Sequence, residues 1–123
     1  MRLTVRSPAG ITPATATSCM VTPNAPFEYF GGTYGGGEEG IAEAECMGGT
    51  VYELEVIVAL FRNGTEVSYN TNTEYVTSTA SADTVYPLSA GSYTTETQAC
   101  VVWTFGGSSS CTGVAANGPV SLP

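Results

Sequence analysis

Carboxylates are the side chains of this sequence with the most potential for catalysis, and two of them have a suggestive spacing. Glu53 and Glu55 lie two positions apart in a segment that alternates between polar and apolar residues. In a β-strand this spacing puts both carboxylates on one face, about 7 Å apart, which superficially suits the pair of a retaining glycosidase. The same pattern describes the solvated face of a half-buried strand, and a small sandwich seldom forms a large cleft. We therefore expect no enzyme activity and no catalytic residue.

A second group of carboxylates follows a glycine-rich run, and it could in principle bind Ca²⁺ through hard oxygen ligands. Its members are Glu38, Glu39, Glu43 and Glu45. The whole chain contains a single aspartate, Asp83, so no Asp-rich ligand ladder accompanies these residues. We expect a solvated acidic loop here, with no metal and no cofactor.

The remaining ionisable residues exclude several classes of function. The 123 residues include Lys+Arg 3, Asp+Glu 11 and no histidine, for a net charge of -8, and all three cations are arginines. Histidine triads, histidine-containing zinc sites and lysine Schiff bases therefore cannot form. Three arginines are too few to neutralise a run of phosphates, so nucleic acid is not an expected partner. Membrane insertion is not expected either, because no stretch of about 20 apolar residues exists.

The clearest structural pattern is a hairpin between Val51 and Tyr75. Every second residue from Tyr52 to Leu60 is apolar, which is typical of a strand with one buried face. Asn63-Gly64 then provides two residues that tolerate the positive φ angles of a type I′ turn. If Arg62 faces Thr65, Leu60 faces Val67 and Val58 faces Tyr69, so the register predicts that the apolar face continues across both strands.

The rest of the chain also consists of strand and turn patterns. A long strand is expected from Ser92 to Phe105, followed by a Gly/Ser turn and a closing strand from Cys111 toward Leu122. Leu88 to Tyr93 resembles the corner that joins the two sheets of a sandwich, where the Tyr93 hydroxyl would bond to the upstream backbone. Shorter strands are expected at 2–6, 17–21 and 41–46. The fold class is therefore all-β, an immunoglobulin-like antiparallel β-sandwich of about seven strands.

The four cysteines favour two disulfides and hence an oxidising, extracellular location. Cys100 and Cys111 flank the Gly/Ser turn almost symmetrically, so they are easily bridged, and Cys19 would then pair with Cys46. The alternative joins Cys46 to Cys100 across the sheets, near Trp103, and leaves Cys19 for Cys111. We prefer the local pairing, although spacing alone does not decide between them.

The N-terminal residues 1–18 are predicted to be an extended arm or an edge strand, followed by one sandwich domain over residues 19–123. No apolar signal-peptide core is present near Met1. The terminal arms, 1–18 and 118–123, are expected to contact a protein partner or further copies of the chain, by strand addition. A possible binding surface consists of four aromatic residues in a glycine-rich context, because aromatic side chains are favoured in interface cores. These are Phe27, Tyr29, Phe30 and Tyr34.

Two stretches resemble a known group of proteins. The first runs from Tyr52-Glu53-Leu54-Glu55-Val56 through Leu60-Phe61-Arg62-Asn63-Gly64-Thr65, and the second is Ala90-Gly91-Ser92-Tyr93-Thr94-Thr95-Glu96-Thr97. Together they are similar to small secreted actinobacterial proteins of the immunoglobulin-like sandwich type. The resemblance covers about Glu45 to Phe105, and it implies a fold rather than an activity. Size, acidity and cysteine number also resemble the apoproteins that carry enediyne chromophores.

These observations predict a non-enzymatic structural or binding module outside the cell. The preferred interpretation is an accessory or decoration subunit of a larger assembly, such as a phage virion capsid. The alternative is a free secreted actinobacterial protein that binds another protein or a small ligand, for example as a chromophore carrier or a hydrolase inhibitor.

Overall fold

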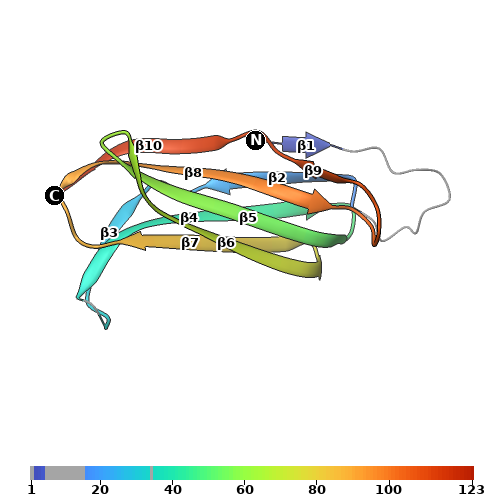
Figure 1. The fold of residues 1–123 in the computed structure, drawn as a ribbon, viewed down its shortest axis with the longest axis horizontal. Helices are drawn as coiled ribbons and strands as arrows, with labels where there is room; N and C mark the ends of the chain where they lie inside the picture. The colour runs from blue at the N-terminus through green and yellow to red at the C-terminus, as the bar shows by residue number, and fades with distance from the viewer. Residues whose placement is uncertain (1, 5–15, 34) are drawn as a thin grey trace.

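The computed structural model describes residues 2–4, 16–33 and 35–123, and every regular element in these ranges is a β-strand. Within these ranges ten strands form two antiparallel sheets that face each other (Figure 1). The first sheet contains β1 (Arg2–Thr4), β2 (Ser18–Pro23), β3 (Phe27–Phe30), β4 (Gly36–Met47) and β7 (Thr79–Tyr86). The second contains β5 (Val51–Arg62), β6 (Thr65–Thr77), β8 (Gly91–Val102), β9 (Ser109–Cys111) and β10 (Ala115–Leu122). The predicted disulfide-stabilised, all-β sandwich is confirmed.

The strand order explains why the described part of the chain has ten strands where the sequence predicted about seven. β4 pairs with β7 along one edge, and its other edge is shared by β2 and β3. In the second sheet β8 pairs with β5 on one edge and with both β9 and β10 on the other. The chain crosses between sheets after β4, β6 and β7, as in immunoglobulin-like sandwiches. The number of strands is higher than predicted because the expected closing strand is divided into β9 and β10, and because β3 and β7 were not predicted.

The missed strand β7 and the true extent of β4 have a common physical cause. Both strands turn small residues inward, Ala80 and Ala82 on β7 and Ala42 and Ala44 on β4, so their hydrophobic alternation is weak. The expected strand at 41–46 begins at Gly36, because Gly36 to Glu39 pairs with β3. The glutamates expected on one acidic loop therefore lie on a strand, and alternation sends Glu38 inward and Glu39 outward.

The core lies between these small residues and larger ones from the second sheet. The fully buried residues of β5 are Val51, Leu54, Val56, Val58 and Leu60. Gly40 of β4 faces them, and a Cβ at this position would lie 2.9 Å from the Thr95 hydroxyl oxygen and 3.4 Å from a Leu60 methyl carbon. Small side chains in one sheet thus make room for large ones in the other, as close packing requires.

The register of the β5–β6 hairpin differs from the prediction. Arg62 pairs with Thr65, and Asn63 (φ 52) and Gly64 (φ 84) both adopt the positive φ angles of the predicted turn. A register shift between Leu60 and Phe61 then makes Leu60 face Ser68 and Val58 face Asn70. Since one residue of shift exchanges the two faces of a strand, the predicted apolar face of β6 was wrong.

The inward face of β6 instead carries polar side chains that bond to the edge of β7. The Ser68 hydroxyl donates to the Val85 carbonyl oxygen at 3.0 Å. The Asn70 and Asn72 amides donate to the carbonyl oxygens of Asp83 and Ser81, each at 2.9 Å. These side chains join the edge strand β7 of one sheet to β6 of the other, which protects an edge that could otherwise pair with another chain.

Candidate functional site

The aromatic residues predicted to bind a partner lie on a hairpin at one end of the sandwich. β3 pairs with the first residues of β4, so that Phe27 faces Glu39 and Tyr29 faces Gly37. The hairpin and its turn project past the body of the sandwich (Figure 1), and Phe30 is 76% exposed. Tyr34, the fourth predicted residue, lies outside the described residues. The structure therefore brings three of the four aromatic residues together on an exposed element.

A shallow apolar groove of about 420 Å³ lies beside this hairpin. Its lining residues come from β3, β4, the end of β7 and the corner that follows: Tyr29, Gly36, Val85, Pro87 and Leu88. Gly37 makes the groove possible, because a Cβ there would lie 2.6 Å from a Val85 methyl carbon and 3.2 Å from the Tyr29 hydroxyl oxygen. Val85 and Leu88 were not predicted as site residues, since each is an isolated apolar residue in a weak pattern.

A pair of carboxyl groups borders the groove. Strand pairing sets Phe27, Glu39 and Val85 side by side in one row on the outer face, and Asp83 lies two residues before Val85 on β7. Burial, a hydrogen bond between the Glu39 and Asp83 side chains and the Asp83 charge raise the pKa of Glu39. The Glu39 carboxyl therefore keeps its proton to a higher pH than an ordinary glutamate does.

The inner face of the same strands holds a buried acid. Glu38 has no exposed surface, and it accepts a hydrogen bond from the Ser89 backbone N–H at 3.3 Å. Burial, the hydrogen bond with Glu28 and the Glu28 charge raise the pKa of Glu38 to about 7, although the Ser89 N–H opposes this shift. Its Oε2 atom has no hydrogen-bond partner among the described residues. A single carboxyl at the corner between the sheets thus titrates near neutral pH.

The corner between β7 and β8 contains the hydrogen bond from Tyr93 to the upstream backbone that the sequence predicted. The Tyr93 hydroxyl donates to the Ser89 carbonyl oxygen at 2.6 Å, and the ring is fully buried at the start of β8. Asn63 of the hairpin turn also bonds here, because its side-chain oxygen accepts the Ser92 backbone N–H at 2.9 Å. Arg62 donates to the Ala90 carbonyl oxygen through two nitrogen atoms, at 3.0 and 2.5 Å. The corner beside the groove is therefore held by several side chains.

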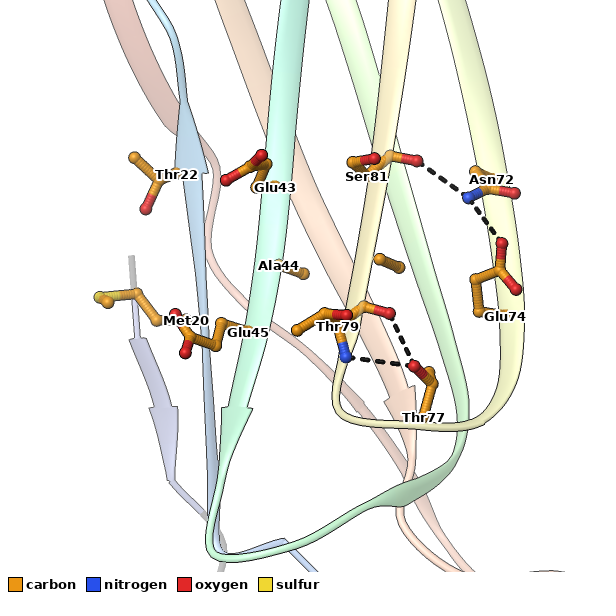
Figure 2. A pocket seen from close by; sticks show the side chains of 11 residues that line it. Met20, Thr22, Glu43, Ala44, Glu45, Asn72, Glu74, Thr77, Thr79 and Ser81 are labelled. Carbon is orange, nitrogen blue, oxygen red and sulfur yellow. Dashed lines mark hydrogen bonds between the residues drawn. The ribbon is translucent and has the colours of Figure 1, made fainter.

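A second groove covers the outer face of β2, β4 and β7, and the end of β6 forms its far side (Figure 2). Glu43 and Glu45 of β4 lie in its floor, while Asn72 and Glu74 lie on β6. The Asn72 amide donates to a Glu74 carboxylate oxygen at 3.2 Å as well as to the Ser81 carbonyl oxygen. Every charged residue that lines this groove is a glutamate.

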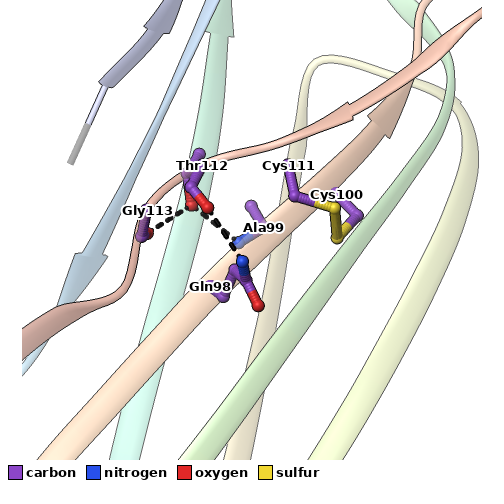
Figure 3. The surroundings of a disulfide bond; sticks show 6 residues. All are labelled: Gln98, Ala99, Cys100, Cys111, Thr112 and Gly113. Atoms are coloured by element: carbon purple, nitrogen blue, oxygen red, sulfur yellow. Dashed lines mark hydrogen bonds between the residues drawn. A yellow bond between two sulfur atoms is a disulfide. The ribbon is translucent and has the colours of Figure 1, made fainter.

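The disulfides lie at the end of the sandwich opposite the aromatic hairpin. Cys19 is bonded to Cys46, and Cys100 to Cys111, so the structure has the local pairing. Each bond joins directly opposite residues of neighbouring strands, with a Cα–Cα distance of 4.0 Å. Cys19 and Cys46 belong to the core with Trp103, whereas Cys100–Cys111 lies on the outer face (Figure 3). The Trp103 indole N–H has no partner among the described residues.

The two glutamates that the sequence analysis considered as a catalytic pair lie on the outer face of a strand. Glu53 and Glu55 pair with Val102 and Cys100 on the outer face of the second sheet, and the grooves described above lie elsewhere. Within the described ranges, no group of three or more acidic, cysteine or histidine residues is placed to hold a metal ion. The same ranges contain no helix long and apolar enough to span a membrane.

The predicted terminal arms are partly strands. Arg2–Thr4 pairs with Ser18–Met20 as the edge strand β1, and residues 5–15 lie outside the described residues. Residues 118–122 belong to β10, which pairs with β8, so they are an edge strand rather than a free arm. Ala16 is buried in the core, and its N–H donates to the Thr50 carbonyl oxygen at 2.9 Å.

Comparison of the chain with protein-family models, curated proteins and solved structures found no match.

Proposed function

We propose that this chain is a non-enzymatic binding module outside the cell, and that it docks a protein partner through the aromatic end of the sandwich. The observation that carries the proposal is the apolar surface of the groove, to which Tyr29, Val85, Pro87 and Leu88 contribute side chains. Phe30, at the end of the same β3 strand, adds a highly exposed ring beside it. Apolar surface that is clustered and rimmed by polar groups is typical of protein interaction sites. The two disulfides support an extracellular location, because such bonds persist in oxidising compartments.

We further propose that the partner belongs to a larger assembly, for which a phage virion is the leading candidate, and that the chain is an accessory or decoration subunit. The N-terminal arm would add a second contact to the partner. The alternative is a free secreted actinobacterial protein that binds one protein or a small ligand. It is favoured by the resemblance of the Tyr52–Thr65 and Ala90–Thr97 segments to such proteins.

Sedimentation of material from the native source tests both proposals. An antibody against the chain should detect it with large particles in a density gradient if it is an assembly subunit. A chain found only at the top of the gradient would contradict the assembly role and leave the secreted alternative.

A surface variant tests the docking end. Phe30→Ser removes a highly exposed ring without touching the core, and we expect it to reduce retention on the particle. The matched control is Tyr69→Ser, which removes a ring of similar exposure, 68%, from β6 of the other sheet. Equal retention of both variants would contradict docking through the aromatic hairpin.

A further inference from the structure

The carboxyl pair beside the apolar groove specifies the chemistry of the docked segment. We infer that the aromatic end binds an extended protein segment with an aliphatic or aromatic side chain in the groove and a lysine or arginine two positions away, over Glu39 and Asp83. This inference rests on the proposed docking function and adds the partner's chemistry to it.

The spacing of the site matches the spacing of an extended chain. Val85, which lines the groove, and Asp83, which belongs to the carboxyl pair, lie two residues apart on β7, and both face outward. Alternate side chains on one face of a strand are about 7 Å apart. A segment that lies extended along β7 can therefore put one side chain into the groove and present the next one on the same face to Asp83 and Glu39.

Charge complementarity selects a cation for the second position. Among the side chains that the structure describes, the only cationic one is that of Arg62, and it is bonded to the Ala90 carbonyl oxygen. Glu39 and Asp83 therefore have no cationic partner from the described part of the chain. The net charge of -8 also disfavours a second copy of this chain as the occupant.

The surroundings of Glu39 show which groups would respond to a bound cation. Asp83 and Tyr86 lie on the neighbouring strand β7, and Glu28 and Tyr29 lie on β3. Glu28 and Tyr86 are in the inner-face row with Glu38, so Asp83 is the acid that faces Glu39 on the outer side. A cation stabilises the ionised form of Glu39, so its contribution to binding increases as rising pH removes the Glu39 proton.

Titration of the isotope-labelled protein with short peptides, followed by NMR, tests the inference. The probe is acetyl-Thr-Leu-Thr-Lys-Thr-amide, and the matched probes carry norleucine or glutamate in place of lysine. We expect amide shifts at Val85, Leu88 and Glu39, and about fivefold tighter binding of the lysine peptide than of the norleucine peptide. The preference should increase between pH 4 and pH 7.

Variants of the acidic pair separate the cation contact from the apolar contact. Glu39→Gln combined with Asp83→Asn should remove the lysine preference while the norleucine peptide still binds. The control is Glu43→Gln, an outward residue of the same strand β4, which should keep the preference. Amide spectra of each free variant show whether it is folded.

The possible outcomes distinguish this inference from the docking function. If the lysine and glutamate peptides bind the unaltered protein equally well at the groove, the partner chemistry is overturned and the apolar docking surface remains. If the shifts map away from Val85 and Leu88, or if no peptide binds, the inference is also overturned. The sedimentation of the Phe30→Ser variant then decides separately whether the end docks a partner.

Discussion

Glu38 and Glu39 are neighbours in the sequence with opposite environments. Glu38 faces the buried corner and Glu39 faces the outer groove, because successive residues of a strand point to opposite faces. Each lies against another acid, Glu28 for the first and Asp83 for the second. The aromatic end of the molecule therefore holds two carboxyl pairs. In each pair burial disfavours the charged form of one member, Glu38 in the first and Glu39 in the second.

The raised pKa of Glu38 predicts that stability decreases as the pH rises. Between pH 4.5 and about 7 the folded state holds a proton on Glu38 that the unfolded state has lost. The free energy of unfolding should therefore fall across this window, by on the order of 3 kcal/mol, and level off above it. Glu39, whose pKa is also raised, adds to the same trend. Urea unfolding at a series of pH values measures the trend.

The variant Glu38→Gln identifies the residue responsible. A neutral amide needs no proton, so the variant should be more stable than the unaltered protein at pH 8 and should show a shallower pH dependence. Glu66→Gln, at an exposed position of β6, is the control that should keep the full slope. A slope unchanged by Glu38→Gln would show that another group causes the trend.

At the scale of elements, β6 has an unusual role, because it pairs with β5 through its backbone and with β7 through its side chains. The register shift near the hairpin turn directs Asn70 and Asn72 inward, where an unshifted hairpin would have placed Tyr69 and Thr71. The amides then bond to carbonyl oxygens on the free edge of β7. The sandwich is thereby closed along one side by polar side chains.

Replacement of both asparagines by alanine tests this closure. Asn70→Ala with Asn72→Ala removes the two hydrogen bonds to β7, together with the bond from Asn72 to Glu74, and should lower the free energy of unfolding by about 1–2 kcal/mol. It should also increase self-association, because the β7 edge becomes available for pairing. Denaturant unfolding and light scattering measure the two effects.

Thr71→Ala with Thr73→Ala is the matched control for that variant. Both threonines face outward on the same strand, so the control reproduces the loss of strand propensity without touching β7. If the two double variants were equally stable and equally monomeric, the side-chain closure would contribute neither to the free energy of unfolding nor to protection against self-association.

The whole molecule has two different ends. Cys19–Cys46 and Cys100–Cys111 lie where β4 and β8 finish, and the aromatic hairpin lies where these strands begin. The first end is cross-linked, while the second carries the groove and both carboxyl pairs. In the proposed function the partner binds one end while the disulfides hold the other.

The two disulfides should differ in their resistance to reduction. Cys111 is exposed on the outer face, whereas Cys19 and Cys46 are buried in the core, so mild reductant should open Cys100–Cys111 first. Cys19–Cys46 should react when the sandwich unfolds. Alkylation at timed intervals followed by mass spectrometry measures the order, and simultaneous labelling of all four cysteines would contradict it.

Loss of either disulfide should destabilise the sandwich. The bonds span 27 and 11 residues, and restriction of the unfolded chain predicts a contribution of about 3 kcal/mol from each, slightly more from Cys19–Cys46. Replacement of each cysteine pair by alanine, followed by denaturant unfolding, measures these contributions.

Composition and local pattern were sufficient to predict the class of the fold and the elements with the clearest sequence patterns. The alternation of β5, the Asn63-Gly64 turn and the position of Tyr93 at the start of a long strand all depend on short-range backbone preferences, which a single sequence displays directly. The aromatic hairpin could also be suggested as a surface, because Phe27, Tyr29 and Phe30 are close together in the sequence.

Only the tertiary structure decided which faces of the strands are buried. A one-residue shift in β6 exchanged its two faces, and pairing with β3 and β7 turned an expected acidic loop into a strand with Glu38 in the interior. The groove also depends on pairing, because Val85 of β7 is far along the chain from Tyr29 and Gly36 of the β3–β4 hairpin. Burial is set by whatever packs opposite a residue, and a local pattern does not contain that information.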